Sequence, residues 1–171
     1  MAKLHFISPT APMPVATTVR FGATGAANNY TTKDEGKPVK LAAESQFDLC
    51  AVGNEIEGYI SSVETGTSGG FSVGGVVSEG AMNVTLDGLQ ATPGTGVVAL
   101  GDYVVAGTIV ARGTALTAFP KVCKATPLTF ATTPAVDFPA GAHLNFKWRV
   151  VSLGTAGTGA VGTSAVIKRV A

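Results

Sequence analysis

The sequence has little charge of either sign. Only 13% of its 171 residues are Asp, Glu, Lys or Arg, and the formal net charge is +1. Soluble domains carry about 25% charged residues, so the surface must be built largely from Thr, Ser, Gly, Asn and Ala. Because the cores of protein interfaces are depleted in charge, this composition favours a surface that partners cover in part. No run of basic residues is present, and we therefore expect no binding to nucleic acid, which needs a basic stripe to neutralise phosphates.

Long apolar runs are also missing. No stretch approaches the roughly 20 consecutive apolar residues of a membrane-spanning helix, and we expect no contact with a membrane. Residues 1–5 carry a charge, but no apolar segment follows them, which predicts that the chain has no secretory signal.

Cysteine and histidine are scarce, with two residues of each. Cys50, Cys123, His5 and His143 show none of the short paired spacings that zinc sites use, so we expect no metal site. In a chain without a secretory signal, the two cysteines are expected to be reduced, buried thiols rather than a disulfide.

Three motifs resemble catalytic or cofactor sites but lack the context that such sites need. Residues 157–162 match a dinucleotide-binding glycine motif, yet the few residues after them form a predicted strand instead of a helix, so we expect a hairpin loop. Residues 66–70 match a nucleophile elbow around Ser68, but a strand follows there too. A solvated strand face explains Glu55 and Glu57 more simply than a glycosidase carboxylate pair. We therefore expect no catalytic residue and no cofactor.

Alternation of apolar and polar residues is what the sequence has in abundance. Between His143 and Val151, an apolar face of Leu144, Phe146, Trp148 and Val150 alternates with polar residues. This period of two predicts an amphipathic strand with an aromatic core face. The other ranges expected to form strands are 15–21, 38–42, 47–52, 56–63, 71–77, 82–86, 103–106, 108–111, 121–125 and 164–170.

Short strands separated by frequent turns predict an all-β fold, a compact β-sandwich or β-barrel. The 22 glycines suit tight turns. The pair Asp87-Gly88 predicts a hairpin turn, because a two-residue hairpin needs positive φ at its centre. Helix is expected at most as one or two turns within residues 40–52.

The first 37 residues differ from the rest. Prolines at positions 9, 12 and 14 exclude a regular helix or a central strand there, and residues 22–37 are small, polar and flexible in composition. We interpret residues 1–37 as an extended N-terminal arm and flexible linker, joined to a β-rich domain at residues 38–171.

Such an arm, with a strand inside it, suits strand addition to a neighbouring molecule. A frayed terminus followed by one ordinary edge strand explains the same pattern equally well. If the segment is an arm, apolar anchors are expected to contact a neighbouring subunit or a larger assembly, and these are Leu4, Phe6, Ile7, Val15, Val19 and Phe21.

Three stretches carry a resemblance to a known family, in texture and order: 47–77, 100–113 and 148–170. Together, over about residues 38–171, they resemble the small tailed-phage capsid decoration, or cement, proteins. The resemblance implies a β-barrel or β-sandwich that binds the outer face of an assembled phage head and clamps neighbouring capsomers. It implies no catalytic residues, and it implies a trimer more often than a dimer or monomer.

Composition and resemblance together predict a structural virion protein without enzymatic activity. The expected partners are the major capsid protein and further copies of the chain, with a homotrimer favoured over a dimer. The expected location is the outer surface of the capsid, after synthesis in the host cytoplasm. The alternative is a head-fibre, tail-fibre or receptor-binding β-domain of a virion. A carbohydrate-binding sandwich is disfavoured, because Trp148, the single tryptophan, lies on an apolar strand face instead of an exposed one.

Overall fold

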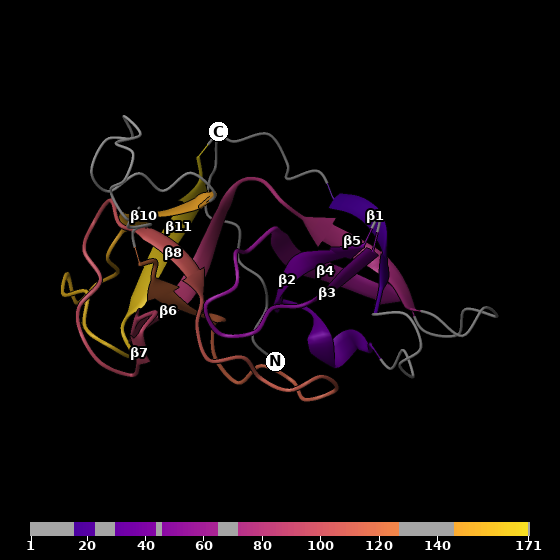
Figure 1. Ribbon diagram of the computed structural model, residues 1–171, viewed down its shortest axis with the longest axis horizontal. Coiled ribbons are helices and arrows are strands. Elements are labelled where there is room, and N and C mark those ends of the chain that lie inside the picture. The colour runs from indigo at the N-terminus through magenta and orange to yellow at the C-terminus, as the bar shows by residue number, and fades with distance from the viewer. Residues whose placement is uncertain (1–15, 23–29, 44–45, 65–71, 127–145, 171) are drawn as a thin grey trace, which may run out of the picture.

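The computed structural model describes residues 16–22, 30–43, 46–64, 72–126 and 146–170 (Figure 1). Within them the fold is all-β with one single turn of 3-10 helix, η1, which confirms the expected class. The elements are β1 (Ala16–Phe21), η1 (Thr32–Asp34), β2 (Pro38–Ala43), β3 (Gln46–Leu49), β4 (Gly58–Glu64), β5 (Ser72–Val77), β6 (Ala81–Leu89), β7 (Thr92–Pro93), β8 (Tyr103–Ala106), β9 (Lys121–Lys124), β10 (Trp148–Ser152) and β11 (Ser164–Arg169).

The strands form two closed sheets. Strands β1 to β5 close a barrel in the order β1-β3-β2-β4-β5, because β1 also pairs with β5. In the other sheet the order is β11-β10-β8-β9-β6, and pairing of β11 with β6 closes it in turn, with the short β7 added beside β6 as a hairpin. We call them the first and the second barrel. Closure leaves few free strand edges, which are the usual sites of unwanted pairing between molecules.

The two barrels repeat one topology. With β7 left aside, each barrel has five strands, which can be numbered one to five in chain order. In both barrels strand one pairs parallel with strand three, as β1 with β3 and β6 with β9, and every other pairing is antiparallel. The register of the parallel pair also agrees. In the first barrel Phe21 of β1 lies opposite Phe47 of β3, and at the equivalent position of the second barrel Leu86 of β6 lies opposite Val122 of β9. Each barrel therefore has the same strand order, orientation and register.

The hairpin between the fourth and fifth strands strengthens this correspondence. In the first barrel the register shifts between Ile60 and Ser62, and in the second it shifts between Val150 and Ser152. A β-bulge thus occupies the same place in both hairpins. Bulges bend a strand and increase its twist, so both barrels use the same device to curve the sheet.

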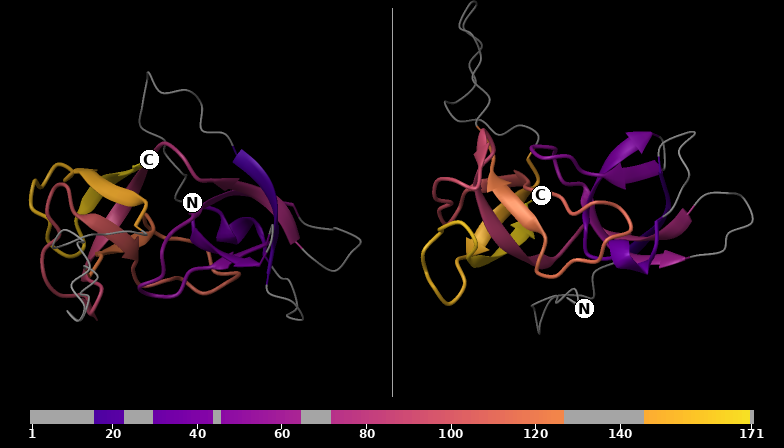
Figure 2. Two further views of the ribbon diagram at one scale, coloured as in Figure 1. Left: turned by 45° about the horizontal axis from the view of Figure 1, so that its top comes forward. Right: turned by 90° about the horizontal axis from the view of Figure 1, so that it is seen from below.

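One hydrophobic cluster spans both barrels, which lie side by side in Figures 1 and 2. Cys50, Ile56 and Tyr59 of the first barrel pack with the core of the second. The Trp148 ring meets Tyr59 edge to face at 5.4 Å, and its indole Nε1 donates to the Ile56 carbonyl at 3.0 Å. Since this core is continuous, the barrels form one packed unit. A separate cluster around Phe21 fills the first barrel alone.

The expected boundary after residue 37 is wrong for the part of the arm that the structure describes. Strand β1 pairs along its whole length with β5, and Val19 and Phe21 lie in the core of their own barrel instead of contacting a neighbour. Tyr30 and Lys37 are buried as well. These residues therefore belong to the first barrel. Leu4, Phe6, Ile7 and Val15 lie outside the described residues.

The predicted hairpin turn at Asp87-Gly88 is also wrong. Strand β6 continues to Leu89, and the chain turns only before β7. Gly88 has φ of +84° inside the strand, where a Cβ atom would overlap the Thr95 backbone. The Asp87 carboxylate accepts hydrogen bonds from the Thr108 amide and hydroxyl, at 2.8 and 2.6 Å. The pair thus marks a tertiary contact, although its sequence is typical of a turn.

Most expected strands are present, with two differences among the described residues. Residues 108–111 form no strand but open a long loop that crosses to the first barrel. The described residues within 40–52 belong to β2, β3 and the loop after β3, so the one or two helical turns that the sequence allowed there do not form. Trp148 and Val150 face the core, as predicted. Phe146 is partly buried and packs against a smaller hydrophobic cluster. Leu144 lies outside the described residues.

Candidate functional site

The described part of the chain carries no evident chemical centre. It contains no group of three or more His, Cys, Asp or Glu residues placed to hold a metal ion. No helix in it is long and apolar enough to cross a membrane. Cys50 and Cys123 are buried, free thiols, as predicted, and burial raises the pKa of Cys50 to about 12 and that of Cys123 to about 11. Protonated thiols are poor nucleophiles, so neither cysteine suits covalent catalysis.

The motifs singled out in the sequence take structural places where the structure describes them. Residues 157–162 lie in the hairpin loop between β10 and β11, as expected. A Cβ atom on Gly159 would overlap the Val98 carbonyl, so close packing of two loops explains this glycine. Residues 66–70, His5 and His143 lie outside the described residues.

Glu55 and Glu57 precede β4 instead of lying on a strand face. Lys147 Nζ lies 2.5 Å from Glu57 Oε1 and 3.8 Å from Glu55 Oε1. Burial raises the pKa of Glu55, and Lys147 opposes that shift. The group is therefore an ion-pair cluster that joins the β3–β4 loop of the first barrel to the residue before β10.

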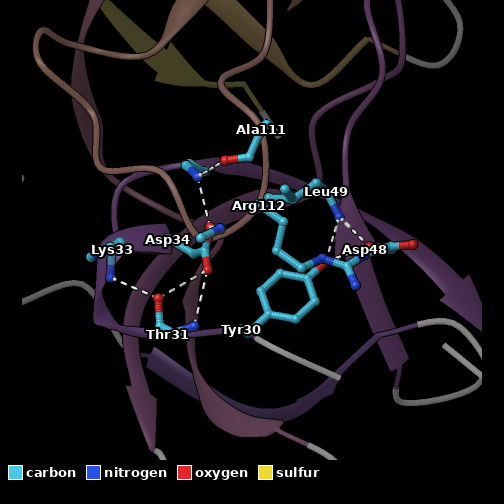
Figure 3. Close-up of polar contacts among 10 residues, drawn as sticks. Tyr30, Thr31, Lys33, Asp34, Asp48, Leu49, Ala111 and Arg112 are labelled. Atoms are coloured by element: carbon cyan, nitrogen blue, oxygen red, sulfur yellow. Dashed lines mark hydrogen bonds and ion pairs between the residues drawn. The ribbon is translucent and has the colours of Figure 1, made fainter. Parts of the chain in front are cut away.

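A buried ion pair fastens the long loop of the second barrel to the first. This loop, residues 107–120, is called the strap here. Asp34 Oδ1 and Lys37 Nζ lie 2.6 Å apart with both side chains fully buried. Lys37 also donates to the carbonyl of Ala111 at 2.7 Å, and the Gly113 amide donates to Asp34 Oδ1 at 2.8 Å (Figure 3). Both charges of the pair are thus completed by backbone groups of the strap.

Arg112 adds a second anchor from the strap. Its guanidinium lies 4.5 Å from the centre of the Tyr30 ring and donates to Asp48 Oδ1 at 3.0 Å (Figure 3). The Tyr30 hydroxyl donates to the same carboxylate and accepts from the Leu49 amide. Burial, with the nearby Asp48 charge, raises the pKa of Tyr30. Stacking and a charge-assisted bond together fix the strap in one position.

A small cavity lies beside the strap. It has a volume of about 190 Å³ and is lined mainly by apolar strap residues together with Lys37, Pro38 and Lys121. Ligand pockets are usually about 300–1,000 Å³ with several converging polar groups. This cavity is smaller, and Lys37 is already paired with Asp34. It therefore does not define a ligand site.

The most distinctive surface is an exposed apolar patch on the second barrel, called the loop face here. Its four residues and their exposed fractions are Val97 (63%), Leu100 (63%), Val151 (45%) and Val161 (39%). Two adjacent segments carry them: Val97 bridges Ala160, and the Gly101 amide donates to the Val150 carbonyl at 2.9 Å. In Figure 1 both segments lie at the left end of the molecule, away from the first barrel.

Charge is absent from the segments that form the loop face. No charged residue occurs in the sequence between Asp87 and Asp102, or between Arg149 and Lys168. Exposed apolar patches without charge are typical of interaction surfaces. The sequence analysis missed this surface, although the two uncharged stretches signal it. Long-range contacts bring the two stretches together: Val97 bridges Ala160, and the Val98 amide donates to the Gly159 carbonyl at 2.9 Å.

No family model, curated protein or solved structure matches the chain.

Proposed function

We propose that the protein is a structural virion protein that binds the outer surface of an assembled phage capsid and cements neighbouring capsomers. The loop face carries this proposal, because it is an exposed apolar surface whose two segments contain no charged residue. The resemblance of residues 38–171 to capsid decoration proteins points the same way. The major capsid protein is the proposed partner, together with further copies of the chain, with a trimer favoured over a dimer.

A role without catalysis fits the chemistry of the described residues. The acidic side chains Asp34, Asp48, Asp87 and Glu57 are all engaged in ion pairs within the chain. Trp148 is buried, so it offers no exposed platform for sugar stacking. These observations favour a binding surface over an active site.

Linkage gives the physical mechanism of cementing. A protein that binds the intact lattice better than free capsomers stabilises the lattice by mass action. A site that spans two or three capsid subunits exists only after assembly, which supplies the difference in affinity. A head presents many such sites, so weak contacts add up over the shell.

The test compares heads with and without the protein. Heads that lack it should assemble but rupture at a lower temperature, and purified protein should restore their resistance. Because the loop face has no charge, binding should fall little between low and high salt. Cryo-electron microscopy of the restored heads should place the protein on the outer surface.

Two outcomes would contradict cementing. Stripped heads that are as robust as decorated ones would remove the function. Density only at a fibre or tail would replace it with the alternative, a head-fibre, tail-fibre or receptor-binding domain.

A further inference from the structure

One strand of the first barrel is paired on both sides over only part of its length. Strand β1 pairs with β5 from Ala16 to Phe21. On its other side, β1 meets β3 only at Arg20 and Phe21. Among the described residues, no strand pairs with residues 16–19 on that side. This unpaired side of residues 16–19 is called the β1 edge here.

The direction of the main chain shows which groups of the β1 edge are free. The Gly22 amide donates to the Phe47 carbonyl of β3 at 2.9 Å. Main-chain groups of successive residues in a strand point alternately to its two sides, so Ala16 and Thr18 direct their N–H and C=O groups to the same side as Gly22. The residues between them bond to β5 instead. Ala16 and Thr18 thus present main-chain donors and acceptors to a further strand.

The side chains of the β1 edge leave it open. Ala16, Thr17 and Thr18 are exposed and uncharged. Native sheets usually protect an edge with charged residues, a proline or a bulge, and the segment contains none of these. The equivalent residues of β6 in the second barrel, Ala81 and Asn83, are half-buried. The β1 edge is therefore the more open template for an added strand.

The sequence before β1 has the pattern of a strand followed by a stiff spacer. Residues 3–6 alternate polar and apolar side chains, which predicts a strand. Between residues 8 and 14, every residue except Thr10 is a proline or directly precedes one. Both kinds of residue favour extended backbone, so a spacer of residues 8–15 should span about 25 Å, at about 3.1 Å per residue. Such a spacer carries the predicted strand away from its own β1 edge and toward a neighbouring molecule.

We propose that residues 3–7 of one copy of this chain add as a strand to the β1 edge of a neighbouring copy. The main-chain groups of Ala16 and Thr18 then gain hydrogen-bond partners, and Leu4 and Phe6 pack toward the barrel that accepts them. Each copy donates one segment and accepts one, so the contact runs head to tail and closes into a ring such as a trimer. This deepens the proposed function and rests on its oligomer, because it assigns the contact that forms it.

Two variants of the full-length chain test the two halves of the contact. Thr18→Pro removes one N–H from the β1 edge and keeps the bonds to β5, which the residues on either side make. Thr18→Val is its matched control, because it keeps the N–H. Leu4→Ser with Phe6→Ser removes the apolar side chains of the donated segment. Circular dichroism and thermal unfolding check that each variant is folded.

Sedimentation velocity at micromolar concentrations should show an oligomer for the parent and for Thr18→Val. Thr18→Pro should weaken association about 10-fold or more, because a hydrogen bond of the added strand is lost and its acceptor stays unpaired. The Leu4→Ser, Phe6→Ser variant should weaken it as well. An equimolar mixture of the two variants should form a complex of one copy of each, since each supplies the half that the other lacks. A monomeric parent, or Thr18→Pro that associates like the parent, would overturn the proposal.

Amide hydrogen exchange gives a readout that does not depend on the folding of Thr18→Pro. In the parent oligomer the Thr18 amide should be protected from exchange, and the Leu4→Ser, Phe6→Ser variant should lose this protection. A protected Thr18 amide in a monomeric parent would place the segment on its own chain and refute exchange between copies.

Binding to stripped heads separates this proposal from the proposed function. A parent that exchanges the segment between copies but never binds heads would refute cementing and leave the exchange standing. A parent that restores the heads as a monomer would refute the exchange and leave cementing standing.

Discussion

At the scale of single residues, the two buried tyrosines differ in how their hydroxyl groups are satisfied. Tyr30 donates to Asp48 and accepts from the Leu49 amide. Tyr59 is fully buried, and its hydroxyl has no hydrogen-bond partner among the described residues. Burial raises the pKa of Tyr59 well above its ordinary value. A buried hydroxyl without a partner costs stability, whereas a bonded one contributes to it.

Tyr59→Phe should therefore leave the free energy of unfolding unchanged or raise it by up to about 1 kcal/mol. The matched change Tyr30→Phe should lower it by about 1–2 kcal/mol, because the Leu49 amide and the Asp48 carboxylate each lose a partner. Urea unfolding of both variants measures the difference. A larger loss for Tyr59→Phe than for Tyr30→Phe would show that the Tyr59 hydroxyl is bonded.

Asp87 should give the protein an acid-sensitive contact. Burial alone would raise the pKa of Asp87, but hydrogen bonds from Thr108 and the Lys121 ammonium outweigh it, and the pKa lies below the ordinary value. Asp87 therefore binds its proton less tightly in the folded state than in the unfolded state, where its pKa is about 3.9. Ionised Asp87 thus stabilises the fold at pH values above about 3.9, and this stabilisation is lost as the pH falls through the folded-state pKa.

The free energy of unfolding should therefore be larger for the parent than for Asp87→Asn near pH 7. The difference between the two proteins should become smaller below about pH 4. Chemical denaturation at a series of pH values measures this gap. Glu79→Gln, a change at an exposed carboxylate, is the control and should show no such pH-dependent gap. A gap that stays constant down to acid pH would mean that Asp87 is not ionised in this contact.

At the scale of elements, the strap shows how a loop without regular structure is held in place. Its anchors are the buried Asp34–Lys37 pair and the Arg112 stack on Tyr30. Replacing one member of a buried ion pair leaves the other charge uncompensated, which costs about 3–5 kcal/mol, whereas replacing both members often costs far less.

Lys37→Met should accordingly lower the free energy of unfolding by about 3–5 kcal/mol. The double variant Asp34→Asn with Lys37→Met should recover part of that loss, because no charge then remains buried. Thr114→Ala, an exposed change in the same strap, serves as the control and should have little effect. Limited proteolysis would show whether cleavage within residues 107–120 increases with Lys37→Met alone. Equal stability of the single and double variants would argue against an ionised pair.

At the scale of the whole molecule, the shared core couples the two barrels. Trp148 is fully buried and touches the first barrel through Tyr59 and Ile56. Separate cores would allow the barrels to unfold one after the other, but a continuous core favours one cooperative transition.

Calorimetry should therefore record a single unfolding transition for the chain. Trp148→Ala should move that transition as a whole, at a cost of about 3–5 kcal/mol, as large aromatic truncations in cores do. Val52→Ala, at an exposed position, should leave it in place. Two resolved transitions, with only one of them displaced, would show that the barrels are independent.

The fold class and the core strands could be predicted from the sequence alone. Alternation alone located Trp148 and Val150 on the buried face, because period two is a local property of an extended chain. The sequence also predicted that both cysteines are buried and that residues 157–162 form a hairpin loop. Low charge suggested a covered surface but did not say where it lies.

Tertiary structure decided the rest, since pairing joins residues far apart in the chain. Val19 and Phe21 read as arm anchors in the sequence, but pairing of β1 with β5 places them in a barrel core. Asp87-Gly88 has the sequence of a turn, yet contacts from Thr95 and Thr108 keep it within a strand. The repeat of the barrel appears only through strand register, because equivalent positions share little sequence. The loop face likewise appears only in the structure, because contacts between distant residues bring its two segments together.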